Sequence, residues 1–182
     1  MNKKYKNRKS TIIAAIALFF FIVFVFAAGA FYDSFFPVKY DEEITRFSNE
    51  YNLEKELVFA VIKAESGFDN RKISEKGATG LMQIMPETAD YIGKEFFNGR
   101  HFDLSSANDN VETGCFYLNY LFARFDNLTE VLASYNAGEG NVKLWKKQKK
   151  SCLDEDDIPF PETRNYVKKV MLYAKIYDLK LR

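Results

Sequence analysis

An uninterrupted apolar run, from Thr11 to Phe31, is the feature that most constrains what this chain can form. The run holds no charged residue over its 21 positions. A helix rises about 1.5 Å per residue, so a helix of this length would span about 30 Å, the hydrocarbon thickness of a bilayer. The alternative, a buried helix of a soluble core, fits poorly with the strongly basic segment that precedes the run. We therefore predict one transmembrane helix over residues 11–31.

The charge that flanks this run predicts its orientation. Residues 1–10 contain five basic residues and no acidic one, and basic flanks stay on the cytoplasmic side of a membrane. We therefore expect a cytoplasmic basic segment over residues 1–10, a signal anchor over residues 11–31, a tether over residues 32–40 and a domain over residues 41–182 outside the cytoplasm. Pro37 is expected to end any helix within the tether.

A cleaved signal peptide is the alternative to an anchor. The apolar region of a signal peptide usually has about 7–15 residues, fewer than are present here. The small residues Ala28, Gly29 and Ala30 nevertheless fit a cleavage pattern. Cleavage after Ala30 would make the domain a secreted protein, whereas the length of the run favours an uncleaved, single-pass anchor. Both interpretations place the domain outside the cytoplasm.

The rest of the chain has the composition of a folded domain. Hydrophobic residues make up 47% of the chain and aromatic residues 16%, which is unlike a disordered sequence. Without the five N-terminal basic residues the net charge is −4, so a nucleic-acid partner is not expected. One His and two Cys without metal-ligand spacing predict no metal site, and no cofactor is expected.

Periodicity and capping signals predict helices in residues 41–182. Three acids begin a helix over residues 41–50, and Asn52 is expected to cap the next helix. Further helices are expected from Pro86 onward, along the apolar stripe Val111, Cys115, Leu118 and Phe122, over residues 128–135, and over residues 166–179 with Val167, Val170, Met171 and Ala174 inward. Residues 73–85 lack a helical period and are expected to form a loop or a small β-hairpin.

Two further features have two interpretations each. Cys115 and Cys152 could form a disulfide outside the cell, or Cys115 could be a buried apolar residue of its helix. The basic residues 146–150 and the acidic residues 154–157 are expected to form a solvated surface loop with local charge pairing. The alternative for this loop is a contact with anionic wall polymers.

One carboxylate, that of Glu65, stands out. It follows Val58 and Ile62 at helical spacing, so it should lie near the inward face of a short helix, which Gly67 would end. Burial and the negative end of the helix dipole both disfavour the charged form and should raise its pKa. A raised pKa suits a general acid that works near neutral pH. The alternative is an exposed Glu in a frayed last turn.

Four short motifs follow one another along the chain. They are Glu65-Ser66-Gly67, Gly80-Leu81-Met82-Gln83, Tyr135-Asn136-Ala137-Gly138 and Glu162-Thr163-Arg164-Asn165-Tyr166-Val167. In this order and at this spacing they resemble the catalytic domain of soluble-type lytic transglycosylases, over roughly residues 40–178. The resemblance implies a mainly α, lysozyme-like helical domain related to goose-type lysozymes, here preceded by one N-terminal transmembrane helix.

The resemblance also implies an enzyme, a peptidoglycan lytic transglycosylase. Such an enzyme cleaves the β-1,4 bond between N-acetylmuramic acid and N-acetylglucosamine without water. Glu65 would act first as general acid and then as base, while the N-acetyl group of the substrate stabilises the oxocarbenium-like centre and its C6 hydroxyl attacks. The product is a 1,6-anhydromuramic end. The implied partners are peptidoglycan glycan strands and the membrane; the sequence identifies no protein partner.

The same resemblance assigns the remaining site residues. Ser66 would lie beside the catalytic carboxyl, and Gly80 would permit a close backbone approach. Met82 and Gln83 would line the cleft, with Gln83 bonding to an N-acetyl or hydroxyl group. Met82 could equally be a core residue.

Residues of the last two motifs would complete the cleft. Tyr135 would form a hydrogen bond near the catalytic carboxyl or the N-acetyl group, and Asn136 would hold a sugar or its own loop. Glu162 and Tyr166 would orient the saccharide or Tyr135, although Tyr166 could equally be a core residue. Asn110 resembles the Asn that starts the long helix of the family, which suggests a helix cap.

Two other functions are compatible with these residues. The first is a muramidase, a lysozyme that admits water and uses a second carboxylate, with Glu162 as the leading candidate. The second is a non-catalytic glycan-binding module, against which the intact set of Glu65, Gln83 and Tyr135 argues. Analysis of the product ends separates the transglycosylase from the muramidase.

Overall fold

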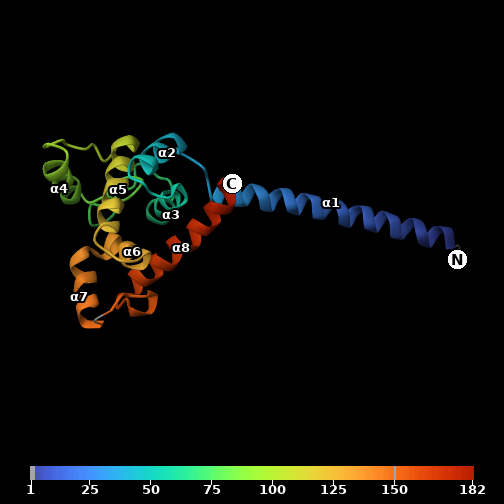
Figure 1. Cartoon of the computed structure of the whole chain (residues 1–182). Helices are drawn as coiled ribbons and strands as arrows, with labels where there is room; N and C mark the ends of the chain where they lie inside the picture. Colours follow the sequence, from blue (N-terminus) through green and yellow to red (C-terminus); the bar gives the residue numbers. More distant parts are fainter. Residues whose placement is uncertain (1–2, 150) are drawn as a thin grey trace. The chain divides into compact units, whose positions relative to one another are not determined.

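The computed structural model describes residues 3–149 and 151–182, which form two compact units, Met1–Pro37 and Val38–Arg182. The first unit consists of helix α1, from Lys3 to Phe35 (Figure 1). Its segment Ala14–Phe35 has a mean hydropathy of 2.7 and is not buried. In the described part of the chain, it is the one helix that is long and apolar enough to cross a membrane.

Helix α1 extends four residues beyond the predicted span. It ends at Phe35, because the residue before a proline avoids the helical conformation and Pro37 follows Phe36. Residues 32–35, which the sequence assigned to a tether, are therefore helical. The division of the chain into domains stays a prediction.

The second unit is built almost entirely from helices (Figure 1). They are α2 (Asp41–Glu50), α3 (Lys55–Glu65), α4 (Pro86–Phe96), α5 (Ala107–Phe122), α6 (Leu128–Ala137), α7 (Glu139–Lys149), the short 3-10 helix η1 (Glu155–Asp157) and α8 (Pro161–Leu181). The predicted starts of α2 and α4 are confirmed.

Helix α3 lies at the centre of the core. Every residue from Leu57 to Ile62 is buried, so the helix is apolar on all sides instead of amphipathic. Its main partner is α8, and the rings of Phe59 and Tyr177 lie 5.1 Å apart between the two helices. This packing fixes the C-terminal end of α3, where Glu65 is the last helical residue.

Three helix boundaries differ from the predictions. Glu54, and not Asn52, is the N-cap of α3, because Asn52 adopts a left-handed conformation (φ 52°) in the turn after α2, which Asn tolerates better than most residues. Helix α6 continues to Ala137, two residues beyond the predicted end. Helix α8 begins at Pro161, because proline fits the first turn of a helix.

The predicted inward faces are confirmed in part. Val111, Cys115 and Leu118 of α5 are buried, but Phe122 is 39% exposed. In α8, Val167 and Val170 are buried, whereas residues 171 and 174 are only half-buried. Cys115 is a buried residue of the core, Cys152 is exposed, and both are free thiols.

Residues 73–85 form a loop with two antiparallel bridges. Ile73 pairs with Thr79, and Thr79 pairs with Ile84; neither bridge extends into a strand within the described residues. The turn at its tip is closed by the Ser74 amide, which donates to the Ala78 carbonyl at 2.9 Å. Gly77 has φ 90° there, a conformation that glycine adopts without strain.

The prediction of a surface loop over residues 146–157 is wrong for the first residues of that segment. Residues 146–149 belong to helix α7; Lys150 lies outside the described residues. The expected charge pairing is confirmed, because the Lys146 ammonium lies 2.7 Å from Glu130 and 2.6 Å from Asp126. Glu130 is fully buried and also accepts hydrogen bonds from the Leu153 and Asp126 amides. This carboxylate joins α6, α7 and the segment that leads to α8.

Replacing Lys146 with Met should destabilise the second unit. The change leaves the buried Glu130 without its cation, and losing a charged hydrogen bond of this kind costs about 2 kcal/mol. Urea unfolding measures the difference. Lys143→Met is the matched control, because Lys143 pairs with Glu139 on the surface and is 59% exposed. Equal stability of the two variants would contradict a structural role for the Glu130–Lys146 pair.

Candidate active site

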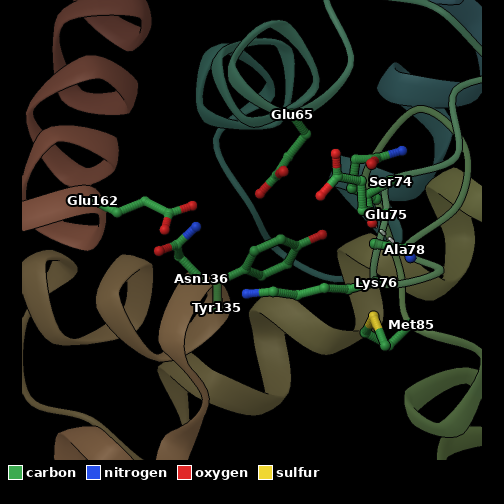
Figure 2. A pocket seen from close by; sticks show the side chains of 10 residues that line it. Glu65, Ser74, Glu75, Lys76, Ala78, Met85, Tyr135, Asn136 and Glu162 are labelled. Atoms are coloured by element: carbon green, nitrogen blue, oxygen red, sulfur yellow. Dashed lines mark hydrogen bonds between the residues drawn. The ribbon is translucent and has the colours of Figure 1, made fainter. Parts of the chain in front are cut away.

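A pocket of about 380 Å³ lies at the end of α3. Its walls come from the ends of three helices and from the loop over residues 73–85 (Figure 2). The lining residues are Glu65, Ser74, Glu75, Lys76, Ala78, Gln83, Met85, Tyr135, Asn136 and Glu162. Five of the nine residues that the sequence assigned to a site therefore meet in one pocket: Glu65, Gln83, Tyr135, Asn136 and Glu162.

Glu65 has the electrostatic character of a general acid. Burial raises the pKa of its carboxyl to about 7, because a low-dielectric surrounding disfavours the charged form. Tyr166, Lys169 and Lys72 oppose this effect and lower the pKa. At neutral pH a large fraction of the Glu65 carboxyl is therefore protonated, as proton donation to a leaving group requires.

Two lysines hold the C-terminal end of α3. The Lys169 ammonium, from α8, donates to the Ala64 carbonyl at 3.3 Å, and the Lys72 ammonium donates to the Glu65 carbonyl. These cations interact favourably with the negative end of the helix dipole. The dipole predicted a raised pKa for Glu65, but neither lysine was predicted to lie here, and Lys169 comes from a helix about a hundred residues away in the sequence.

Removing Lys169 should move the pH dependence of catalysis. Lys169 lowers the pKa of Glu65, so Lys169→Met should raise that pKa. Activity that needs protonated Glu65 declines as pH rises through the pKa; we therefore expect the decline to move to higher pH. A pH–rate profile measures it. Lys168→Met is the control, because Lys168 lies near Glu155 and Asp156 instead; an unchanged Lys169→Met profile would contradict the assignment.

Two tyrosines, the half-buried Tyr135 and the buried Tyr166, flank Glu65. The Tyr135 hydroxyl donates to the Met82 carbonyl at 2.8 Å, and its predicted hydrogen bond near the catalytic carboxyl or to the N-acetyl group of the substrate stays a prediction. The Tyr166 hydroxyl is buried and has no hydrogen-bond partner of normal geometry among the described residues. Burial and then the proximity of Glu65 hold the pKa of both hydroxyls well above their usual range. Both tyrosines therefore stay protonated and can act as donors.

Helix α8 and the end of α6 supply the side of the pocket opposite the loop. Glu162 and Asn136 reach into the pocket on this side, and Ser74 and Glu75 lie across from them (Figure 2). The Asn136 amide oxygen accepts a hydrogen bond from the Thr163 hydroxyl at 2.8 Å. Asn136 therefore holds the start of α8, which carries Glu162, against the end of α6.

Gln83 lines the pocket in an unusual backbone conformation. Its φ of 49° is left-handed, and its amide nitrogen donates to the Lys72 and Gly80 carbonyls at 3.0 and 2.9 Å. The amide nitrogen of Gln83 therefore holds the loop together. The bond that Gln83 is expected to form with a sugar group stays a prediction, in which the amide oxygen would be the acceptor.

Two of the predicted site residues, Met82 and Ser66, form contacts within the fold. The Met82 side chain is fully buried and packs so closely against Gly114 that a Cβ there would lie 2.3 Å from its sulfur; it is a core residue. The Ser66 hydroxyl donates to the Ile62 carbonyl and accepts from the Phe68 amide. Ser66 therefore closes the end of α3, and its role beside the catalytic carboxyl stays a prediction.

Gly80 and Asn110 are positioning residues for the loop. A Cβ at Gly80 would lie 2.2 Å from the Asn110 amide nitrogen, so the close approach that glycine permits is to Asn110. The Asn110 side chain is fully buried; it accepts from the Met82 amide at 2.8 Å and donates to the Thr79 and Leu104 carbonyls. The prediction that Asn110 caps its helix is wrong, since Ser106 is the N-cap of α5.

Sequence reasoning missed the residues of the turn that forms the opposite wall. Ser74, Glu75, Lys76 and Ala78 line the pocket, although the sequence analysis gave them no role. The turn signal at Gly77 predicted a loop here, but no local pattern indicated which structure the loop would face.

A cation site lies elsewhere, and a lysine already occupies it. Asp126, Glu130 and Cys152 are the one group of potential ligands close enough together among the described residues. The Lys146 ammonium pairs with both carboxylates, and none of the three residues lines the pocket that contains Glu65.

Comparison with known proteins places these residues in a family. Residues 42–158 match the model of the Transglycosylase SLT domain, and residues 157–182 match that of the soluble lytic transglycosylase helical domain. The chain is 34% identical over 151 residues to a soluble lytic murein transglycosylase of Salmonella typhimurium. It is 27% identical over 157 residues to the membrane-bound lytic murein transglycosylase C of Actinobacillus pleuropneumoniae. These alignments cover 78% and 70% of the chain, but only 23% and 42% of the two relatives.

The fold agrees with a solved structure. The 70 kDa soluble lytic transglycosylase of Escherichia coli superposes with a TM-score of 0.75 at 32% identity, over 80% of this chain and 25% of that protein. The chain thus spans about a quarter of the length of this protein and of the Salmonella relative. The prediction of a mainly α, lysozyme-like domain after one apolar N-terminal helix is confirmed.

Proposed function

The chain belongs to the Transglycosylase SLT domain family, and from this premise we propose that it is a peptidoglycan lytic transglycosylase. Its substrate is the β-1,4 bond between N-acetylmuramic acid and N-acetylglucosamine. The observation that carries the proposal is Glu65, a carboxyl whose pKa burial raises to about 7 in a pocket of about 380 Å³. Cleavage of a glycosidic bond begins with a protonated acid beside the bound sugar.

In the proposed reaction Glu65 first donates one proton and then accepts another. Its carboxyl first protonates the glycosidic oxygen, and the bond from that oxygen to C1 of N-acetylmuramic acid breaks. The oxygen of the substrate N-acetyl group stabilises the developing charge at C1. The Glu65 carboxylate then removes the proton of the C6 hydroxyl, whose oxygen bonds to C1. The products are a 1,6-anhydromuramic end and a free hydroxyl, and Glu65 is again protonated.

The surroundings of Glu65 support both proton transfers. The buried Tyr166 hydroxyl has no other partner among the described residues and can donate to the Glu65 carboxylate after the first transfer, or to the substrate. Donation to the charged form lowers the pKa of Glu65, which favours release of the proton to the leaving group. Tyr166 and the two lysines thus limit how far burial raises the pKa.

Hydrolysis is the second candidate function, because the pocket holds two further carboxylates. Glu75 and Glu162 line it from opposite sides (Figure 2), and either could activate a water molecule if the site admits one. Among the described residues neither forms an ion pair in the pocket, and both are exposed. The proposal of a single acid and base therefore predicts that neither Glu75→Gln nor Glu162→Gln changes the chemical identity of the product.

Localisation at the membrane is part of the same proposal. The apolar segment Ala14–Phe35 would span the bilayer once, with the basic residues 1–10 in the cytoplasm. The second unit would then act outside the cytoplasm, where peptidoglycan lies. Relatives that are named membrane-bound support an anchored form; cleavage after Ala30 would instead release the unit.

Mass spectrometry of the products tests the function. Purified glycan strands are digested with the full chain, and the new ends are identified. Anhydromuramic ends support the transglycosylase. Reducing ends would show a muramidase and make Glu162 and Glu75 the candidate bases, and binding without cleavage would show a non-catalytic module.

A further inference from the structure

A second pocket continues the first one away from Glu65. It has a volume of about 340 Å³ and shares Lys76, Gln83, Met85, Tyr135 and Asn136 with the first pocket. Its additional wall includes Thr88 of α4 and Tyr117 of α5. The cleft therefore extends from the catalytic carboxyl toward the surface that α4 and α5 form.

A row of aromatic rings continues this wall. The Tyr117 ring lies 5.4 Å from Tyr135 and 6.1 Å from Tyr120, measured between ring centroids. Tyr120 is followed by Tyr91 at 6.5 Å, and Tyr91 by Phe96 at 5.9 Å. We call Tyr117, Tyr120, Tyr91 and Phe96 the aromatic ridge. Tyr117 and Tyr120 lie three residues apart on α5, and Tyr91 and Phe96 lie five residues apart on α4. Two helices therefore carry one connected set of rings.

The outer members of the ridge are strongly exposed. Tyr91 is 48% exposed and Phe96 is 44% exposed, although large aromatic side chains are usually buried or matched to a partner. Polar groups adjoin the rings: the Tyr120 hydroxyl donates to the Glu139 carboxylate at 3.2 Å, and the Arg124 guanidinium lies 3.5 Å from the centroid of the Tyr120 ring. Exposed rings beside hydrogen-bonding groups suit a ligand with apolar faces and polar edges.

A pyranose sugar has this character. Its C–H groups form an apolar face that stacks on an aromatic ring, and its hydroxyl and N-acetyl groups extend from the edge. A glycan strand bound at Glu65 must leave the pocket along an open direction. The second pocket and the ridge offer such a direction, and they are continuous with the proposed substrate site through Tyr135 and Tyr117.

We propose that the aromatic ridge binds further sugar residues of the same glycan strand, beyond those held beside Glu65. The inference rests on the proposed glycan substrate. It makes the enzyme selective for long strands, because only a long strand reaches both the pocket and the ridge. Tyr91 is the determining residue, since it is the most exposed ring of the ridge and its ring contacts are with Phe96 and Tyr120, both members of the ridge.

The test compares strand lengths with the full chain in detergent. KM is measured for a peptidoglycan-derived tetrasaccharide and for long glycan strands. Tyr91→Ala should raise the ratio of KM for long strands to KM for the tetrasaccharide by about tenfold, the size expected for loss of one aromatic contact. Tyr91→Phe, which keeps the ring, should leave the ratio close to that of the unaltered chain.

Phe122→Ala is the matched control. Phe122 is an exposed ring at the end of α5, but it lines a different pocket, with Leu53, Leu57 and Leu128. This variant should leave the ratio unchanged. Thermal unfolding of each variant identifies any loss of folded protein, and binding of long strands in the Glu65→Gln background repeats the comparison without turnover.

Two results would overturn the proposal. A Tyr91→Ala variant that loses stability but keeps the KM ratio would show that the ridge only packs α4 against α5. A ratio that rises as much in Tyr91→Phe as in Tyr91→Ala would show a role for the hydroxyl and not for stacking. Failure of the unaltered chain to cleave or bind any glycan is a different result, which refutes the proposed function itself.

Discussion

Glu65→Gln should abolish glycan cleavage while the fold and glycan binding persist. The glutamine keeps the size of the side chain but cannot donate a proton to the glycosidic oxygen. Loss of a general acid lowers a rate on the order of 10³-fold or more when no other group replaces it. The measurement is the rate at which new strand ends appear in digests of purified peptidoglycan, with binding of the variant to the same strands as the control for an intact pocket.

The same substitution should also change how stability depends on pH. The pKa of Glu65 is about 7, against an ordinary value of 4.5, so the folded chain holds this proton more tightly than the unfolded chain. The stabilisation is fully present below the ordinary pKa and is lost as pH rises through 7. Above that pH the ionised, buried carboxylate costs roughly 2–3 kcal/mol relative to acidic conditions, and the neutral glutamine does not.

Urea unfolding at about pH 5 and about pH 8.5 tests this dependence. Glu65→Gln should lose less stability between the two conditions than the unaltered chain. Cleavage that persists in Glu65→Gln would refute Glu65 as the acid. If the stability of both proteins depends on pH in the same way, the pKa of the Glu65 carboxyl is not raised, even if cleavage is lost.

Asn110→Ala should weaken both the fold and the catalytic rate. The substitution removes three hydrogen bonds in a fully buried place. It leaves the Met82 amide and the Leu104 carbonyl without a partner, whereas the Thr79 carbonyl still accepts from the Ile84 amide at 3.1 Å. An unsatisfied buried polar group costs about 1–3 kcal/mol, so a loss of about 3 kcal/mol or more is expected for the two unsatisfied groups and the third lost bond together. The loop that carries Met82 and Gln83 should then shift relative to Tyr135, whose hydroxyl bonds to the Met82 carbonyl.

Urea unfolding and the initial rate of cleavage measure these two effects. Asn119→Ala is the matched control, because Asn119 lies on the same helix and donates one hydrogen bond, to the Tyr51 carbonyl, at an exposed site. Asn110→Asp adds a second comparison, since it keeps the acceptor for the Met82 amide but places oxygen against the two carbonyls. If Asn110→Ala and Asn119→Ala are equally stable, the buried hydrogen bonds of Asn110 do not hold the loop.

The sequence predicted those parts of the fold that depend on local signals. The starts of α2 and α4 follow from acidic residues and from proline in a first turn, which act on the helix that contains them. The start of α8 at Pro161 carries the same signal and was still missed, because the motif that begins there was interpreted as a site. Asn52 failed as a cap because the turn after α2 placed it in a left-handed conformation.

For the site as well, the sequence predicted what depends on local signals and not what depends on contacts between distant segments. Glu65 could be identified because its helix, its spacing and its stop signal lie within a few residues. The roles of Asn110, Lys169 and Met82 depend on contacts between segments that are tens of residues apart, such as the 105-residue separation between Lys169 and Ala64. No periodicity encodes such contacts, so Met82 was placed in the cleft when it packs against Gly114 in the core.

The pairing of α3 with α8 also affects when the chain becomes functional during its synthesis. Glu65 is made about a hundred residues before Tyr166 and Lys169, and loops of that length close slowly compared with local helices. Until α8 has emerged and docked, the carboxyl of Glu65 lacks the full burial that raises its pKa, and it also lacks Tyr166 and Lys169, which limit that rise. A partly synthesised chain would thus carry an ordinary, ionised glutamate, and glycan cleavage would begin only after the last helix has folded against the third.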